Sequence, residues 1–254
     1  MSAPSAVTQE GGRVGYKDKL KHWAHRTLDP IVGGLSGAGV KPDHLTVAGF
    51  ILSVGAAIAF YEGQMRVGAF ILIAAGICDI LDGQIARRTQ TATRFGAFFD
   101  STLDRVAEAV VLIGLAGFYC SNLLGLYGKA AALVTQVASG EIEGPFALVI
   151  LRQQPIDPRA WVVLTLTSML ALTGSFMVSY TRARAEGLGL DCKVGWFERP
   201  ERIVLLIVAG LAQVFWAMSA ALMLLTILSF FTAAQRMVHV YRITRAAGAD
   251  HTEV

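Results

Sequence analysis

Six long apolar segments constrain the fold of this 254-residue chain more than any other feature. About 20 apolar residues are needed for an α-helix to cross a bilayer. Charged residues make up only 16% of the chain, against about 25% in an average soluble domain. We therefore predict an all-α membrane protein with six transmembrane helices. The segments lie at about 44–62, 67–86, 96–120, 160–181, 203–216 and 217–238.

The connections between these segments differ in length. The last two segments are nearly continuous, so we expect a tight turn near Ala217–Ser219. Residues 121–159 contain three prolines and an apolar run (FALVIL) that is too short to span a bilayer. We expect an exterior loop there, in which this apolar run could form a surface helix.

The two ends of the chain lack such segments. Residues 1–15 are small and polar, without the apolar stretch of a signal peptide, and we expect a disordered tail. Residues 16–40 place Leu20, Trp23 and Leu28 opposite several lysines, which is typical of an amphipathic helix on a membrane surface. A soluble surface helix is the alternative. The six-helix domain then covers 41–245, and 246–254 form a cytoplasmic tail.

The placement of positive charge predicts the orientation. With the N-terminus in the cytoplasm, 18 of the 22 Lys and Arg residues fall on the cytoplasmic side and four fall outside. Such a bias is typical of multi-pass proteins. We expect both termini in the cytoplasm and an integral protein of the plasma membrane. The net charge of +3 does not suggest nucleic-acid binding.

Four carboxylates interrupt the second and third segments. Asp79 and Asp82 are three residues apart, and Asp100 and Asp104 are four apart, so each pair projects from one helical face. A short polar linker lets the two faces point at each other. Ionisable groups at membrane depth are costly, and they are functional candidates by default.

Carboxylates alone suit hard divalent cations such as Mg²⁺ or Mn²⁺. Two alternatives remain at this point: a buried ion network with Arg87, Arg94 and Arg105, and an ion or proton pathway through the acids. We favour metal-assisted chemistry on a phosphorylated substrate, because such ions offset phosphate charge.

The residues around these acids follow the pattern Asp-x2-Asp-Gly-x2-Ala-Arg-x8-Gly-x3-Asp-x3-Asp. It is met by Asp79, Asp82, Gly83, Ala86, Arg87, Gly96, Asp100 and Asp104. This pattern resembles the signature of the CDP-alcohol phosphotransferases. The resemblance implies a six-helix membrane enzyme, usually a homodimer. Such an enzyme transfers a phosphatidyl-type group from a CDP-linked lipid, CDP-diacylglycerol or its archaeal equivalent, to an alcohol and releases CMP.

The same resemblance implies roles for individual residues. All four aspartates would be ligands of two divalent ions, and Asp104 would also be the general base. Gly83 and Arg87 would contact the CDP pyrophosphate, and Thr93 would lie near the cytidine.

A second element, KPDHLT at 41–46, resembles the Pro-Asn-x-x-Thr element that precedes the first span in this family. It adds Asp43 and Thr46 to the residues expected to bind the CDP-lipid. Asp43 stands where the family has Asn, and a plain helix cap is the alternative role for its side chain.

The arginine-rich turn at 179–202 bears on the acceptor. The strings ARAEGLG and ERPER resemble the branch that acts on inositol phosphate, the phosphatidylinositol phosphate synthases and their archaeal relatives. By that resemblance Ser179, Arg182 and Arg202 would hold the acceptor phosphate. Arginine forks suit phosphate oxygens, although exposed arginines near anionic headgroups need no special role. The closest rival acceptor is glycerol 3-phosphate.

Together with Arg184 and Arg199, these arginines are expected to gather at the mouth of the site. An alternative role for Arg199 is to brace the turn through Glu198 or Glu201.

Overall fold

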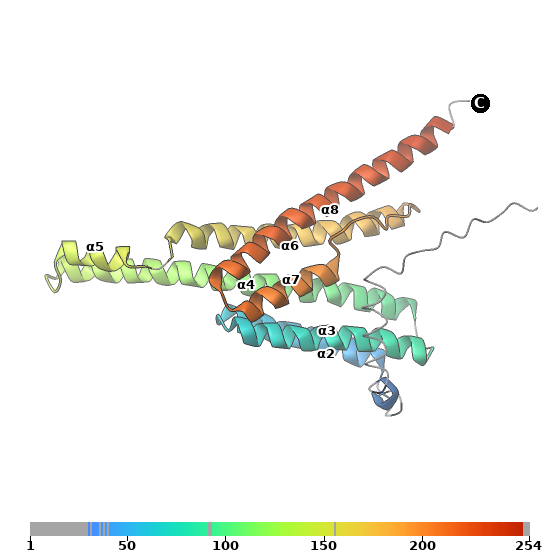
Figure 1. Cartoon of the computed structure of the whole chain (residues 1–254), viewed down its shortest axis with the longest axis horizontal. Helices are drawn as coiled ribbons and strands as arrows, with labels where there is room; N and C mark the ends of the chain where they lie inside the picture. The colour runs from blue at the N-terminus through green and yellow to red at the C-terminus, as the bar shows by residue number, and fades with distance from the viewer. Residues whose placement is uncertain are drawn as a thin grey trace, which may run out of the picture.

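The computed structural model describes Pro30, residues 32–35, Gly37, Gly39, and residues 41–90, 93–154 and 156–250, without the side chains of 247–250. All regular structure in this part of the chain is helical, which confirms the all-α prediction (Figure 1). The helices are α2 (Pro42–Tyr61), α3 (Met65–Arg88), α4 (Arg94–Ala138), α5 (Gly144–Arg152), α6 (Pro158–Gly187), α7 (Arg199–Ala212) and α8 (Phe215–Asp250).

The helices pack around one buried apolar core. Helix α2 lies against α3 and α4, while α6 lies against α4 and α8. Helix α4 belongs to both groups, and helix α7 connects them a second time because it contacts both α3 and α8 (Figure 1). Phe60, Leu112, Leu115, Leu206 and Leu222 are almost fully buried in this core. Between helices in lipid, close packing of such side chains contributes to the association.

Small residues allow α3 and α7 to approach closely. A Cβ atom on Gly210 would lie 2.9 Å from both the Ala69 side chain and the Met65 carbonyl oxygen. That is closer than real Cβ contacts, so only glycine fits at this crossing. The crossing matters for the site, because α3 carries Asp79 and α7 begins at Arg199.

Five of these helices are long and apolar enough to cross a membrane: α2, α3, α4, α6 and α8. Helix α7 has only 14 residues, or about 21 Å at 1.5 Å per residue, against a hydrocarbon core of about 30 Å. The chain is thus an integral membrane protein with five candidate spans. Helix α7, which covers most of the expected span at 203–216, is shorter than the hydrocarbon core is thick.

The break between α7 and α8 lies at Gln213 and Val214, not at Ala217–Ser219 as expected. Gln213 adopts a left-handed conformation with φ of 53°, which ends α7. Ser219 is buried inside α8, and its hydroxyl donates to the Phe215 carbonyl at 2.8 Å. No glycine or proline marks the break in the sequence, which is why its position was predicted wrongly.

The exterior loop expected over 121–159 is largely helical instead. Helix α4 continues for 45 residues to Ala138, about 67 Å, or twice the thickness of the hydrocarbon core. Helix α5 lies against its far end (Figure 1). The stretch before Gly140 contains no proline and many helix-forming residues, and Gly140, with φ of 75°, ends the helix. The predicted tail at 1–15 and most of the interfacial segment at 16–40 lie outside the described residues.

Candidate active site

Helices α3 and α4 bring three of the four predicted carboxylates together. One oxygen each from Asp79, Asp82 and Asp100 lies within 4.8 Å of the others. Asp82 is only 6% exposed. Within the described part of the chain, the buried Oδ1 atom of Asp100 has no hydrogen-bond partner. A group of carboxylates with an unsatisfied oxygen fits a divalent cation, since hard cations prefer oxygen ligands.

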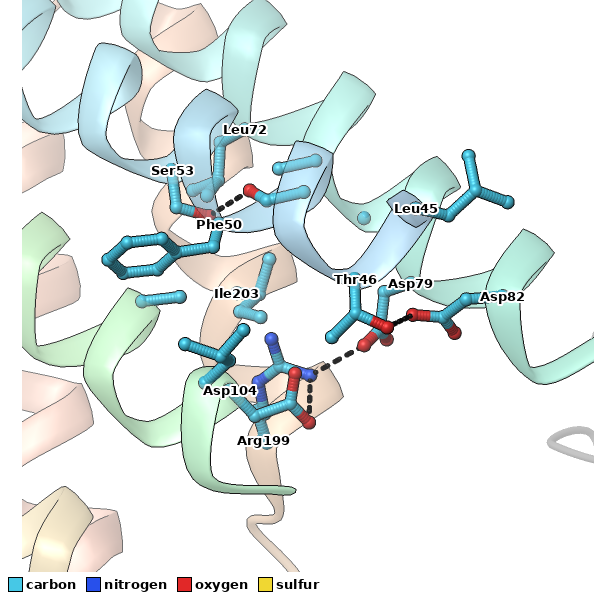
Figure 2. Close-up of a pocket in the computed structure, with 15 residues that line it drawn as sticks. Leu45, Thr46, Phe50, Ser53, Leu72, Asp79, Asp82, Asp104, Arg199 and Ile203 are labelled. Atoms are coloured by element: carbon cyan, nitrogen blue, oxygen red, sulfur yellow. Dashed lines mark hydrogen bonds and ion pairs between the residues drawn. The ribbon is translucent and has the colours of Figure 1, made fainter. Parts of the chain in front are cut away.

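Thr46 at the start of α2 orients one of these acids. Its hydroxyl donates to Asp82 Oδ2 at 2.7 Å and lies 3.3 Å from the Pro42 carbonyl oxygen (Figure 2). Because α2 packs against α3, the start of α2 holds the Asp82 carboxylate in one orientation. Thr46 of the KPDHLT element thus lies next to the acids.

The fourth acid, Asp104, lies outside the three-carboxylate group and pairs with an arginine. Nη1 of Arg199 lies 2.6 Å from Asp104 Oδ2 and 3.1 Å from Asp79 Oδ1. Figure 2 shows this guanidinium between the two carboxylates. Arg199 therefore lies at the acids, at the mouth of the site as expected, and does not follow the alternative of bracing Glu198 or Glu201. The reason is that α7 begins beside the acids and directs the side chain toward them.

A second arginine of α7 forms a buried ion pair. Nε and Nη2 of Arg202 donate to the two carboxylate oxygens of Glu108, at 2.5 and 2.8 Å. The two side chains are 1% and 3% exposed. Arg202 also donates to the Phe197 carbonyl at 3.3 Å. With its guanidinium engaged in this way, the expected role of Arg202 in holding the acceptor phosphate gives way to a structural one.

The linker before α7 is fixed from α8. The buried guanidinium of Arg236 donates to the carbonyls of Val194 and Val178, at 2.8 and 2.5 Å. It also lies 3.5 Å from Glu198 Oε1. Glu198 and Glu201 form a capping box at the start of α7. These contacts set where α7 begins, and so where Arg199 points.

A cavity of about 510 Å³ lies directly beside the acids. Small side chains and backbone form much of its wall, which leaves room for a ligand. Its lining includes Lys41, Pro42, Asp43, Thr46, Asp82, Gly83, Ala86, Thr93, Gly96 and Asp100. Four of the five residues expected to bind the CDP-lipid are in this lining.

Arg87, the fifth residue expected to bind the CDP-lipid, is exposed and is not among the described residues that line this cavity. Its Nη2 atom lies 3.6 Å from the position that a Cβ atom on Gly83 would take. The guanidinium is therefore close to the cavity, on the same helix as Gly83.

Two of the lining residues have local roles at helix ends. Thr93 is the N-cap of α4, and its hydroxyl accepts from the Gly96 amide at 2.9 Å. Asp43 lies in the first turn of α2, where the cap position belongs to Lys41. A plain helix cap is therefore not its role, and its exposed carboxylate faces the cavity.

The residues expected to bind the acceptor have different surroundings in the described part of the chain. Ser179 lines a separate groove of about 510 Å³ together with Arg105, Phe176 and Tyr180. Arg182 pairs with Glu186 at 2.9 Å and lies 3.9 Å from Glu198.

The alternative of a buried network with Arg87, Arg94 and Arg105 is not observed among the described residues. The acids pair with Arg199 instead, and Arg105 donates to the Ser101 carbonyl.

Sequence reasoning missed Glu108 as a partner of Arg202 and did not pair Arg199 with Asp79 and Asp104. Both carried a signal. Glu108 follows Asp104 by four residues in an apolar stretch, and thus shares its helical face. Arg199 is a cation in the first turn of a helix, where the helix dipole disfavours positive charge.

Comparison with known proteins places the chain among lipid-synthesis enzymes. It is 34% identical over 220 residues to archaetidylinositol phosphate synthase of Methanothermobacter thermautotrophicus, covering 85% of this chain and 90% of that protein. It is 30% identical over 223 residues to phosphatidylinositol phosphate synthase of Mycobacterium tuberculosis, covering 85% and 86%.

Solved structures agree. A crystal structure of the Mycobacterium tuberculosis synthase with bound CDP-DAG has a TM-score of 0.63 and 29% identity, and covers 85% of this chain and 94% of that one. A second, in complex with manganese and citrate, also has a TM-score of 0.63 and 29% identity, and covers 84% and 88%. The profile of the CDP-alcohol phosphatidyltransferases matches residues 40–233. The chain therefore belongs to the CDP-alcohol phosphatidyltransferase family.

Proposed function

We propose that this enzyme transfers a phosphatidyl group from a CDP-linked lipid, such as CDP-diacylglycerol, to inositol phosphate with release of CMP. The observation that carries the proposal is the group of Asp79, Asp82 and Asp100 beside a cavity of about 510 Å³. A nucleotide pyrophosphate requires ligands for a divalent cation and, next to them, a cavity that can hold the nucleotide. Because the family consists of transferases, the alternative of an ion transporter is set aside.

The aspartates would hold two divalent ions, Mg²⁺ or Mn²⁺. Asp79, Asp82 and Asp100 already lie close enough to share one ion, and Asp104 would complete the set. The ions would supply positive charge that offsets the charge of the pyrophosphate and of the leaving CMP. Manganese in a crystal structure of the Mycobacterium tuberculosis relative supports this donor set.

The cavity would receive the CDP part of the donor. Gly83 and Gly96 lack side chains, so that a phosphate or a nucleoside can approach the backbone of both helices. Asp43, Thr46 and Thr93 would contact the nucleotide, and Arg87 would contact the pyrophosphate. The CDP-DAG bound to the solved relative supports a donor of this kind.

Asp104 would act as the general base. Its carboxylate takes the proton of the acceptor hydroxyl as that oxygen attacks the phosphorus bearing the lipid. A new phosphorus–oxygen bond forms, the bond to the CMP oxygen breaks, and CMP leaves with the electron pair.

The acceptor is inositol phosphate in this proposal. Relatives that cover most of the chain are named as synthases of inositol phosphate lipids. Ser179 and Arg182 would bind the acceptor phosphate from the C-terminal part of α6. The positive-inside charge pattern supports an active site on the cytoplasmic side of the plasma membrane, with both termini in the cytoplasm. We further propose a homodimer with six spans, in which α7 contributes the short fifth span.

Measurement of CMP release tests the proposal. Purified protein is given CDP-diacylglycerol with Mg²⁺ or Mn²⁺, and inositol phosphate, glycerol 3-phosphate, inositol or serine in parallel. Turnover with inositol phosphate alone is the expected result, and Asp79→Asn is the inactive control. Turnover only with glycerol 3-phosphate would retain the metal centre and replace the acceptor.

A further inference from the structure

We propose that Arg199 is an internal counter-cation of the aspartate site, and that Asp104 becomes available to a divalent ion only when Arg199 moves away. This inference rests on the proposed metal centre and adds a residue that the family signature does not contain. It makes Arg199 a positioning residue, which controls when the fourth aspartate can act.

The geometry puts the guanidinium where a cation would bind. A single nitrogen, Nη1, contacts Asp104 at 2.6 Å and Asp79 at 3.1 Å. It thus bridges one acid of α3 and one of α4, as a shared metal ion does. In the group of Asp79, Asp82 and Asp100, Arg199 pairs only with Asp79. One ion can therefore bind with little rearrangement, whereas an ion at Asp104 competes with Arg199.

The two arginines of α7 differ in how firmly they are held. Arg202 uses three of its nitrogens, on Glu108 and on the Phe197 carbonyl, and it is 1% exposed. Arg199 is 24% exposed and holds the acids through Nη1 alone. Its buried Nε has no hydrogen-bond partner among the described residues. Arg202 can therefore anchor α7 while the Arg199 side chain changes its rotamer.

The position of Arg199 in the helix also argues for a role at the acids. It is the first residue of α7, directly after the N-cap Glu198. The positive end of a helix dipole destabilises a cation there, so α7 itself gains nothing from this arginine. Residues that are unfavourable for their own secondary structure are expected mainly at functional sites. Here the guanidinium offsets the mutual repulsion of the acids when no divalent ion is present.

The consequence is a measurable competition. A ligand that binds only the minor, open state has its apparent affinity lowered by the fraction of molecules in that state. If Arg199 pairs with Asp104 in about nine molecules of ten, the ion that needs Asp104 binds roughly tenfold more weakly. Removal of the guanidinium abolishes that penalty.

Electron paramagnetic resonance of Mn²⁺ measures this without lipid or turnover, because free Mn²⁺ gives a signal that bound Mn²⁺ loses. The full-length protein in detergent is titrated with Mn²⁺ as wild type, Arg199→Gln and Arg199→Ala. We expect the wild type to bind one ion, and a second at roughly tenfold higher Mn²⁺, whereas both variants bind two ions in one range. Elution from a sizing column shows that each variant is folded.

Arg105→Gln is the matched control. Arg105 follows Asp104 directly and is also a cation near the acids, but it donates to the Ser101 carbonyl rather than to a carboxylate. Its removal changes the local charge equally without freeing Asp104, so the second ion should still bind weakly.

Two outcomes would overturn the inference: unchanged binding of the second ion in Arg199→Gln and Arg199→Ala, or equal tightening in Arg105→Gln. Asp79→Asn separates this failure from that of the metal centre. If wild type and Asp79→Asn both bind no Mn²⁺, the proposed centre fails together with the inference.

Discussion

Glu108 accepts two hydrogen bonds from Arg202 one helical turn along α4 from the pair of Asp104 and Arg199. Residues 104 and 108 share a face of α4, and residues 199 and 202 share a face of α7. The two ion pairs thus form a ladder between the helices. The inner pair, Glu108 with Arg202, is buried and hydrogen-bonded through both carboxylate oxygens, and it fixes the register of α7. The outer pair, Asp104 with Arg199, borders the acid cluster.

The inner pair should be essential for stability. Removing one partner of a buried ion pair leaves an uncompensated charge, at a cost of about 3–5 kcal/mol. Arg202→Met should therefore lower the thermal unfolding temperature strongly, measured in detergent. The double variant Glu108→Leu with Arg202→Met should recover much of the loss, since no charge is left unpaired. If the double variant were less stable than the single one, the pair would not be what holds α7.

Asp104→Asn should separate donor binding from chemistry. The amide cannot take a proton, so CMP release should fall by about 10²- to 10⁴-fold, as expected for loss of a general base. Binding of the CDP-lipid, measured by thermal shift, should persist because Asp79, Asp82 and Asp100 remain. Turnover near that of the wild type would remove Asp104 from the role of base.

Substitution at Gly83 should affect the donor and not the fold. A Cβ atom there would meet only Arg87 Nη2, at 3.6 Å, which is an ordinary contact. Gly83→Ala inside α3 should raise stability by up to about 1 kcal/mol, from helix propensity. The methyl group nevertheless enters the cavity, so the KM for the CDP-lipid should rise. A less stable Gly83→Ala with an unchanged KM would mean that the glycine serves packing instead.

Thr46→Val tests the orientation of Asp82. The isosteric change deletes the donor to Asp82 Oδ2, which accepts from Thr46 at 2.7 Å. We expect weaker Mn²⁺ binding, by about tenfold for loss of a hydrogen bond to a charged group worth about 1.5 kcal/mol. Thr102→Val is the control, because Thr102 on α4 donates only to the Phe98 carbonyl among the described residues. Equal effects of the two changes would show that Thr46 does not act on Asp82.

Much of this protein follows from local patterns. The apolar stretches determine a helical membrane protein because each segment must satisfy its own backbone hydrogen bonds in lipid. The spacing of Asp79 with Asp82 places both on one face of α3, and the short linker to α4 brings Asp100 to them. Gly83, Thr93 and Gly96 line the adjoining cavity for the same reason. These features depend on residues within some 25 positions of one another, so helical periodicity is sufficient to predict them.

The sequence alone determined the helical membrane class, the family signature and the two pairs of aspartates that face each other, whereas the structure groups Asp79, Asp82 and Asp100 and leaves Asp104 outside. Only the tertiary structure decided the partners of Arg199 and Arg202, the length of α4 and the break at Gln213. The arginine partners lie some 90 to 120 residues away in sequence and depend on how α7 packs against α3 and α8. The type of charge and the local spacing do not identify which of the many acidic residues pairs with a given arginine. That choice is made by helix packing, which brings one carboxylate within reach of each guanidinium and buries the pair.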